Sequence, residues 1–295
     1  MEEARRISNS EVGTWLTCKA KYRFAFDMKL EKINKSEALN RGILGHEVLE
    51  QYYSCLRDGM SHDAGVVVAV NYLQTVMIDH PEQADMCMEL HTLLTRFWDY
   101  WRGNPDWKIL ETESAYDLEI TEQFTMPMRL DLLVQEIATG KIYLVDHKFC
   151  YDFWNEDDIA LSPQFAKYVG ALRANGIVVD GCILNQVRYR KLKDNDPEKS
   201  FKHTYVKPSD AKIKNTIKEH IQSSVEIVAY RDNTIEERER LSVKVLNKMV
   251  CKGCDYKNLC MSELDGGEID FLIENEYKPN SYDYNKEEST QEGLL

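Results

Sequence analysis

Residues 126–148 read MPMRLDLLVQEIATGKIYLVDHK, two apolar runs with a short polar segment between them. The runs are rich in leucine, valine and isoleucine, and residues 138–140 supply turn chemistry, so the stretch predicts two strands joined by a tight turn. Asp131 interrupts the first run, and Asp146 and Lys148 end the second. Side chains two apart on a strand share a face, so Asp146 and Lys148 point the same way. Two carboxylates and a lysine at the end of a sheet suggest a metal site with an attached base.

The composition is that of a globular protein of 295 residues, enough for one large domain or two small ones. No apolar run approaches the roughly 18 residues that a membrane span needs, and no apolar segment follows the charged start at residues 1–6. We therefore expect no membrane association and a cytoplasmic location, in a bacterial, archaeal or phage-infected cell. In a reducing compartment the eight cysteines are expected to be thiols or metal ligands rather than disulfides.

The net charge of −13 is unevenly distributed. Residues 262–295 carry −8, which predicts an acidic, flexible tail; disorder is favoured there over imitation of DNA or contact with a protein partner. Residues 188–218 carry +6, with Tyr189 and Tyr205 among the basic side chains. This segment could follow a phosphate backbone, but on charge alone an ordinary solvated loop and helix face is favoured.

Helical spacing surrounds the predicted hairpin. His46 lies on a helix with Leu49 and Tyr53 on its own face, where a single histidine is more often a core residue than a ligand. The string from His46 to Glu50 resembles the zinc-protease pattern H-E-x-x-H, but Glu50 stands in place of the second histidine, so a zinc protease is a weak hypothesis. Residues 61–103 predict two helices broken at His80-Pro81.

Two further segments flank the hairpin in the chain. Residues 107–120 predict a strand that carries Glu111 and Glu113 on one face. Residues 158–175 predict a helix on which Gln164 and Tyr168 are i, i+4 neighbours. Taken alone, this pair would be a surface contact.

Three cysteines, Cys251, Cys254 and Cys260, fall within ten residues near the end of the chain. This spacing lets the thiolates converge on one metal centre, which lacks a fourth ligand. Cys18 is the natural candidate, but the sequence does not select it over four others, which are Cys55, Cys87, Cys150 and Cys182.

Together these motifs resemble the RecB-type nucleases of the PD-(D/E)XK superfamily. The resemblance rests on five elements in order: a Gly-x-x-x-His helix, a strand with a buried Asp, an Asp-x-Lys strand end, a Gln-x-x-x-Tyr helix, and an early cysteine with a C-terminal C-x2-C-x5-C. It covers residues 8–260. More narrowly, the motifs resemble the iron-sulfur branch of these nucleases, which includes CRISPR-associated exonucleases and phage or bacterial recombination exonucleases.

The resemblance implies a role for each matching residue. Asp131 and Asp146 would hold Mg²⁺ or Mn²⁺ together with the backbone carbonyl of His147, and His46 and Glu113 would be further ligands, with Glu111 an alternative to Glu113. Lys148 would orient or deprotonate the attacking water. The remaining assignments are Gln164 and Tyr168 as positioners of the scissile strand, and Cys18, Cys251, Cys254 and Cys260 as holders of a [4Fe-4S] cluster, or of Zn²⁺ as the alternative.

The sequence departs from the family pattern at three points. Met128 stands where a glycine usually precedes the first aspartate, and Asp146 replaces the commoner glutamate. The helical block at residues 61–103 is long for the compact CRISPR-associated members, which favours a phage or mobile-element exonuclease.

The expected fold is an α/β restriction-endonuclease-like core, a small mixed sheet flanked by helices. The nuclease domain would span residues 1–261, with a helical insertion at 61–103 and a cysteine clasp joining Cys18 to residues 251–260; residues 262–295 would form the tail. The expected function is Mg²⁺- or Mn²⁺-dependent exonuclease action on DNA that is single-stranded or has free ends, in recombination, repair or phage DNA metabolism. The alternatives are a CRISPR-adaptation nuclease and a non-catalytic DNA-binding or assembly module. The sequence also allows a protein partner that binds the tail, and it allows an oligomer.

Overall fold

The computed structural model describes residues 4–102, 104–194 and 196–280. The chain divides into two compact units, each assembled from separate stretches. The sheet unit comprises Ser36–Ala115 and Arg129–Ile213. The cysteine unit comprises Met1–Lys35, Tyr116–Met128 and Lys214–Leu295.

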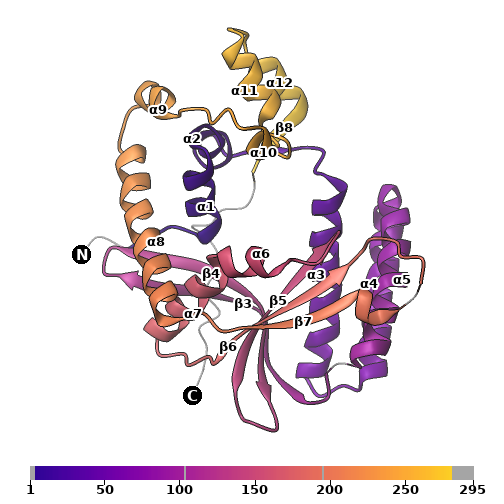
Figure 1. Ribbon diagram of the computed structural model, residues 1–295. Coiled ribbons are helices and arrows are strands. Elements are labelled where there is room, and N and C mark those ends of the chain that lie inside the picture. Colours follow the sequence, from indigo (N-terminus) through magenta and orange to yellow (C-terminus); the bar gives the residue numbers. More distant parts are fainter. Residues whose placement is uncertain (1–3, 103, 195, 281–295) are drawn as a thin grey trace. The chain divides into compact units, whose positions relative to one another are not determined.

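A mixed sheet forms the centre of the sheet unit (Figure 1). Strand β5 pairs antiparallel with β4 and parallel with β6, and β7 pairs antiparallel with β6, while β3 joins the other edge of β4. The strands are β3 (Trp107–Thr121), β4 (Phe124–Glu136), β5 (Ile142–Cys150), β6 (Gly181–Arg188) and β7 (Phe201–Val206). The first parts of β4 and the last parts of β3 belong to the cysteine unit.

The predicted hairpin is present as β4 and β5. Its turn contains Gly140, whose φ of 69° lies in the left-handed region that glycine adopts without steric cost. The side chain of Gln135 donates to the carbonyl of Gly140 over 3.0 Å and closes the turn. The turn residues of the sequence therefore fix the register that brings Leu132 opposite Val145.

Three helices cover one face of the sheet. These are α3 (Glu37–Arg57), α4 (His62–Asp79) and α5 (Ala84–Trp101), with a short turn η2 (Pro81–Gln83) at the expected break. Ser36 and Ser61 cap the first two by accepting backbone N–H groups. The helices share one hydrophobic core with strands β4, β5, β6 and β7. Val48, Leu94 and Phe97 of the helices pack there with strand residues such as Val145 and Ile183.

The connection from β5 to β6 places α6 (Glu156–Leu161) and α7 (Gln164–Ala174) in a β-α-β crossover. By strand alternation, Asp146 and Lys148 lie on the opposite face of β5 from the core residue Val145. Gln164 of α7 contacts Asp146, so α7 covers that second face. A last short turn, η3 (Pro197–Lys199), precedes β7.

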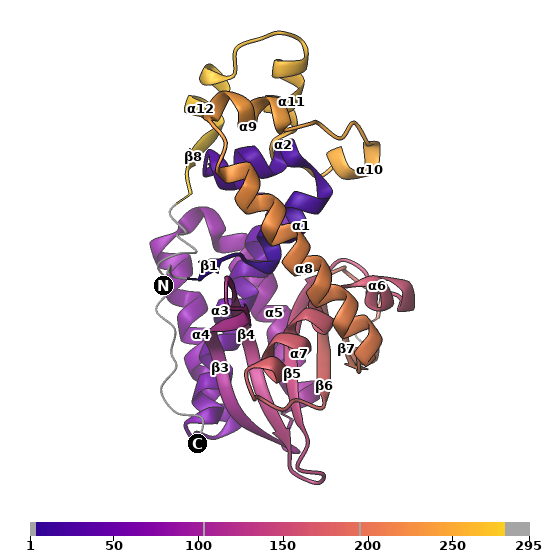
Figure 2. The same cartoon turned by 90° about the vertical axis from the view of Figure 1, so that its left-hand side faces the viewer.

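The cysteine unit is mostly helical (Figures 1 and 2). Val12 and Trp15 of α1 pack with Ile227 and Tyr230 of α8 in one core cluster. Strands β2 and β8 pair antiparallel, joining early and late parts of the chain. The elements are β1 (Arg5–Arg6), α1 (Asn9–Thr17), α2 (Lys19–Tyr22), η1 (Arg23–Asp27), β2 (Leu30–Lys32), α8 (Asp210–Arg231), α9 (Ile235–Leu241), α10 (Lys248–Cys251), α11 (Lys257–Leu264), α12 (Asp270–Glu276) and β8 (Tyr277–Pro279).

Residues 262–280, predicted as the start of the acidic tail, form the end of α11, α12 and β8. Residues 281–295 of the predicted tail lie outside the described part of the chain. Among the described residues, the helices are all too short or too polar to cross a membrane.

Candidate active site

The candidate site lies where β4 and β5 separate. Their pairing runs from Gln135–Ile142 to Leu132–Val145, and Asp131 and Asp146 are the next residues along the two strands. Beyond this point β5 continues with β6 as far as Cys150 and Arg188. The separation frees backbone groups in mid-sheet, and the backbone N–H of His147 donates to Oδ2 of Asp131 over 2.6 Å. Both predicted carboxylates therefore occupy the gap between two diverging strands.

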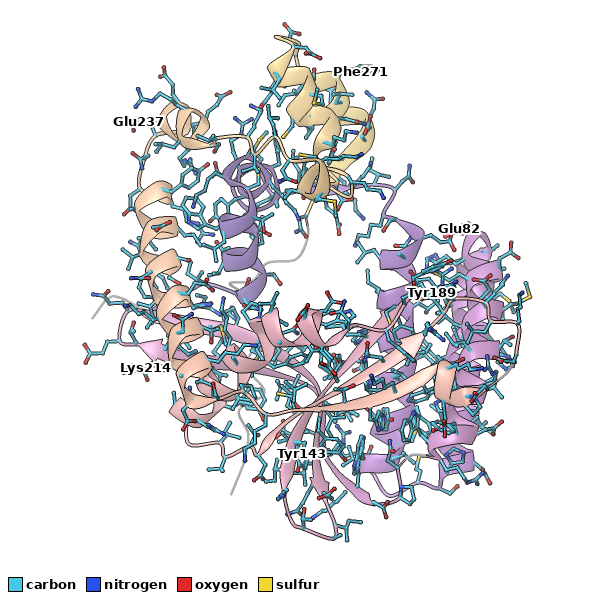
Figure 3. The ribbon with its side chains drawn as sticks, in the orientation of Figure 1. Glu82, Tyr143, Tyr189, Lys214, Glu237 and Phe271 are labelled. Atoms are coloured by element: carbon cyan, nitrogen blue, oxygen red, sulfur yellow. The ribbon has the colours of Figure 1, made fainter. Side chains whose placement is uncertain are left out.

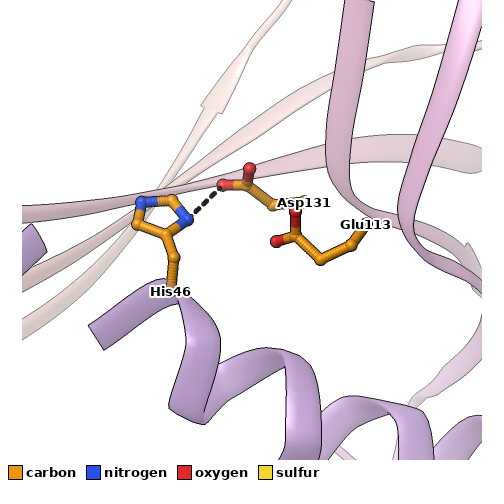
Figure 4. A group of neighbouring side chains, drawn as sticks. All are labelled: His46, Glu113 and Asp131. Atoms are coloured by element: carbon orange, nitrogen blue, oxygen red, sulfur yellow. Dashed lines mark ion pairs between the residues drawn. The ribbon is translucent and has the colours of Figure 1, made fainter. Parts of the chain in front are cut away.

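Helix α3 reaches this gap from one face of the sheet. Nδ1 of His46 lies 3.4 Å from Oδ2 of Asp131 (Figure 4). The close approach depends on Gly45, because a Cβ atom there would clash with the ring of Phe149 on β5. Gly42, the glycine of the predicted motif, has no heavy atom within 4 Å of such a Cβ. The packing glycine is thus Gly45, while Gly42 faces open space one turn before His46.

Glu113 joins His46 and Asp131 from strand β3. One ligand atom of each of these three residues lies within 4.8 Å of the others, which makes a group able to hold a metal ion (Figure 4). Glu113 has a φ of 46°, a left-handed conformation that is unusual for a non-glycine residue in a strand. Such strain persists where the surroundings over-determine it, often at functional sites. Of the two alternative glutamates, the structure brings Glu113 into the group and not Glu111.

The carboxylates of the group are electrostatically crowded. Burial, and next the charge of Asp131, raise the pKa of Glu113 to about 8, although Arg129 lies 3.1 Å from its Oε2. Burial is also the main cause that raises the pKa of Asp131 to about 6, with Asp146 adding to it and His46 opposing it. A bound cation would relieve both effects, because it favours the ionised form of each carboxyl group.

Asp146 is engaged on the other face. Its Oδ2 lies 2.8 Å from Nζ of Lys148, and its Oδ1 accepts a hydrogen bond from Nε2 of Gln164 over 2.9 Å. It is outside the group of His46, Glu113 and Asp131. The side chain of Asp146 is 7% exposed and that of Lys148 is 27% exposed, so the lysine is the solvent-facing member of the pair.

Tyr168 lies one turn after Gln164 on α7. Burial raises the pKa of its phenol, and the charges of Asp146 and Asp131 raise it further. The hydroxyl therefore remains a neutral donor beside two carboxylates. All the predicted residues of the hairpin, of α3 and of α7 are consequently brought together within the sheet unit.

His147 has a different environment from its neighbours on β5. Its ring is 2% exposed, stacks on Tyr53 with centroids 5.5 Å apart, and places Nδ1 2.6 Å from Nδ2 of Asn185. Burial lowers its pKa well below the usual value, so the ring stays neutral. Its side chain is thus part of the packing, and its backbone is the part that faces Asp131. Sequence reasoning missed Asn185, although a polar residue in the buried run of β6 is a usable signal.

The four predicted cluster cysteines line a single cavity of about 50 Å³ in the cysteine unit. Cys18 sits in extended conformation, with a φ of −165°, between α1 and α2. Helix α1 ends before Cys18 and α2 begins after it, and this break places Cys18 at the cavity. The other described cysteines, Cys55, Cys87, Cys150 and Cys182, belong to the sheet unit.

Basic side chains line the cavity beside the cysteines. Three lysines, Lys21, Lys244 and Lys257, line it with the cysteines. Burial, and then the neighbouring Cys254 and Cys18, raise the pKa of Cys260 to about 11. Four sulfur atoms around one cavity form a donor set that a soft metal centre would stabilise.

These features define a class, an α/β protein in which acidic residues able to hold a cation lie at the divergence of two strands in a mixed sheet. A model of the family described as the PD-(D/E)XK nuclease superfamily matches residues 6–261. The chain belongs to this superfamily, and it is accordingly a nuclease with a mixed sheet flanked by helices, as predicted.

Comparisons with solved structures and with curated sequences give weaker similarity or none. A solved structure described as the crystal structure of SSO0001 is similar over 88% of this chain and 87% of that chain, at 12% identity and a TM-score of 0.40. A comparison with curated protein sequences gave no match.

Proposed function

We propose that this protein is a RecB-type exonuclease that hydrolyses phosphodiester bonds of DNA with the help of Mg²⁺ or Mn²⁺, in recombination, repair or phage DNA metabolism. The observation that carries the proposal is the group of His46, Glu113 and Asp131 at the same strand divergence as Asp146 and Lys148. A scaffold that only bound DNA would have no use for a lysine held against a carboxylate in this place.

The residues fit a divalent ion. Carboxylate oxygens suit Mg²⁺ and Mn²⁺, and an imidazole nitrogen suits Mn²⁺. His46, Glu113 and Asp131 would hold the ion, with Asp146 as the further carboxylate that the family pattern assigns. When bound, such an ion lowers the pKa of water and offsets charge on the phosphate.

The remaining residues act on the water and the phosphate. Lys148, 2.8 Å from Asp146, is placed to orient a water and to accept or return its proton. Attack by the water oxygen forms one P–O bond while the bond to the departing sugar oxygen breaks. The proton that the water loses is returned to that oxygen through Lys148 or solvent. Tyr168, a neutral phenol, donates to a phosphate oxygen, and Gln164 holds Asp146 in place.

We further propose that Cys18, Cys251, Cys254 and Cys260 bind a [4Fe-4S] cluster. Their convergence on one cavity supports this proposal, and so does the exclusively sulfur donor set with three lysines around it. Bound there, the cluster would tie the break after α1 to the C-terminal helices of the same unit.

The enzymatic proposal is tested with DNA labelled at the 5′ or the 3′ end, single- and double-stranded, with Mn²⁺ and anaerobically purified protein. We expect progressive loss of label from single-stranded ends, and much slower digestion by Lys148→Met. Lys108→Met, an exposed lysine at the start of β3, is the matched control and should digest normally. If the wild-type protein and Lys148→Met leave all substrates equally intact, the proposal fails.

The cluster proposal is tested by iron and sulfide analysis and by visible absorption. Cys254→Ser should lose iron and sulfide, whereas Cys87→Ser, a buried cysteine of the sheet unit, should keep them. Zinc without sulfide in the wild-type protein would show that the site is a zinc centre instead.

A further inference from the structure

A large cavity of about 650 Å³ lies in the sheet unit, away from the residues assigned above. Its walls come from the start of α3, from α5 and from the loop that follows β6. Figure 3 labels Tyr189 of that loop beside α3 and α5. The volume falls within the range of small-molecule and cofactor sites, so the cavity can hold a nucleotide-sized group.

The lining is basic. Five cations, Arg41, Arg96, Arg188, Arg190 and Lys191, face two carboxylates, Asp85 and Glu89, in a chain whose net charge is −13. Three of the five belong to the basic segment 188–218. The cavity therefore collects positive charge where an acidic protein could attract an anion.

The arginines are pre-organised by aromatic rings. The guanidinium of Arg41, whose side chain is 8% exposed, lies 4.5 Å from the ring centre of Tyr189. Arg188 lies 4.6 Å from the ring of Phe153, and Arg190 lies 5.4 Å from the ring of Tyr151. Planar guanidinium groups held in this way bind phosphate with little further ordering.

Three of these cations, Arg41, Arg190 and Lys191, pair with exposed acids that a phosphate can replace. Glu89 lies 3.1 Å from Arg41 and 3.3 Å from Lys191, and Asp152 lies 2.9 Å from Arg190. The side chains of Glu89 and Asp152 are 45% and 56% exposed. Exposed ion pairs contribute little, whereas bidentate contacts of arginine with phosphate are strong.

The cavity and the candidate active site share two elements. Arg41 precedes His46 by five residues on α3, a rise of about 7.5 Å at 1.5 Å per residue. The open position at Gly42 lies between them. On the sheet, β5 and β6 end together at Cys150 and Arg188, two residues beyond Lys148. Ligands of α/β proteins bind at such carboxyl ends of parallel strands.

We propose that this cavity binds internal phosphates of a single-stranded DNA substrate a few nucleotides from the scissile bond, with a base stacked on Tyr151. The proposal rests on the proposed function, because it takes DNA as the substrate. Single-strand sites combine a basic groove with exposed aromatic rings, and Tyr151 is 57% exposed.

The test measures binding without hydrolysis, by fluorescence anisotropy of a labelled oligothymidine in the presence of a chelator. Arg190→Gln/Lys191→Gln removes two charges from the cavity, and Lys202→Gln/Lys207→Gln removes two exposed charges from the same basic segment outside it. We expect the first pair to weaken binding about tenfold or more and to reduce the salt slope by about 1.4, at roughly 0.7 for each phosphate that is no longer neutralised. The control pair should change Kd less than twofold.

Equal effects of the two pairs would overturn the proposal, while absence of any DNA binding by the wild-type protein would count against the proposed function itself. Loss of binding only for oligonucleotides that carry a terminal phosphate would show a terminal-phosphate site and would overturn the assignment to internal phosphates. Tyr151→Ala should weaken binding and Tyr151→Phe should preserve it, because both aromatic rings can stack. Equal affinities of these two variants would refute the stacking contact.

Discussion

The backbone N–H of His147 donates to Oδ2 of Asp131 across 2.6 Å, at the point where their two strands stop pairing. A carboxylate thus takes the place of the carbonyl that would continue the ladder. The same oxygen lies 3.4 Å from His46, so this bond fixes the aspartate between a strand and a helix. The position of the candidate cation site is therefore set by the backbone of the fold.

The two glutamates of β3 should differ in metal binding. Glu113→Gln removes an anionic ligand from the group and should weaken Mn²⁺ binding by more than about tenfold. Loss of a residue that only supports a metal ligand already lowers metal affinity by about tenfold or more. Glu111→Gln is the matched control, and its affinity should remain near the wild-type value. Isothermal titration with Mn²⁺ decides the matter, and a larger loss in Glu111→Gln would reverse the assignment.

Lys148→Met should separate chemistry from metal binding. Lys148 contacts Asp146 and lies outside the group that could hold the ion, so we expect cleavage to fall by about 10²–10⁴ while Mn²⁺ affinity changes little. Single-turnover cleavage and metal titration of one preparation give the two quantities. A parallel loss of metal affinity would mean that Lys148 supports the site structurally.

Metal affinity should rise with pH between about 6 and 8. In the ion-free protein the pKa of Asp131 is about 6 and that of Glu113 is about 8. A cation binds the ionised carboxylates, so it must displace about one proton within this range and about two below it. The association constant should therefore increase roughly tenfold per pH unit across the range, and Glu113→Gln should flatten the dependence. Titration in two buffers of different ionisation enthalpy counts the released protons, and a pH-independent affinity would contradict the expectation.

Two glycines of α3 should respond oppositely to alanine. Gly45→Ala puts a methyl group against the ring of Phe149 and should destabilise the protein by about 1–3 kcal/mol. Gly42→Ala meets no neighbour and should stabilise the helix by up to about 1 kcal/mol. Urea unfolding curves measure both changes. Phe149→Leu should partly rescue Gly45→Ala; if it does not, the clash has been placed on the wrong side chain.

Local patterns predicted much of the sheet unit from the sequence. Turn residues and apolar runs identified β4 and β5, and the break at His80-Pro81 separated α4 from α5. The residues of the candidate site were located through the order of the motifs, because each motif alone has a simpler explanation.

What the sequence did not predict depends on tertiary context. The left-handed backbone of Glu113 has no signature in a strand of alternating residues, and nothing local breaks the helical pattern at Cys18. The glycine that matters for packing, Gly45, was overlooked in favour of Gly42 because only the neighbour across the interface distinguishes them. The pairing of β2 with β8 joins segments that are far apart in the chain.

That pairing has a consequence for the order of folding during synthesis. The sheet unit is complete once Ile213 has been made, whereas the cysteine unit needs β8 and the late cysteines. On the ribosome, Cys18 is therefore made long before the three late cysteines with which it lines the cavity. A chain truncated shortly before Cys251 would retain every candidate catalytic side chain and the packing of α1 on α8, but it would lose β8 and three of the four cysteines of the cavity.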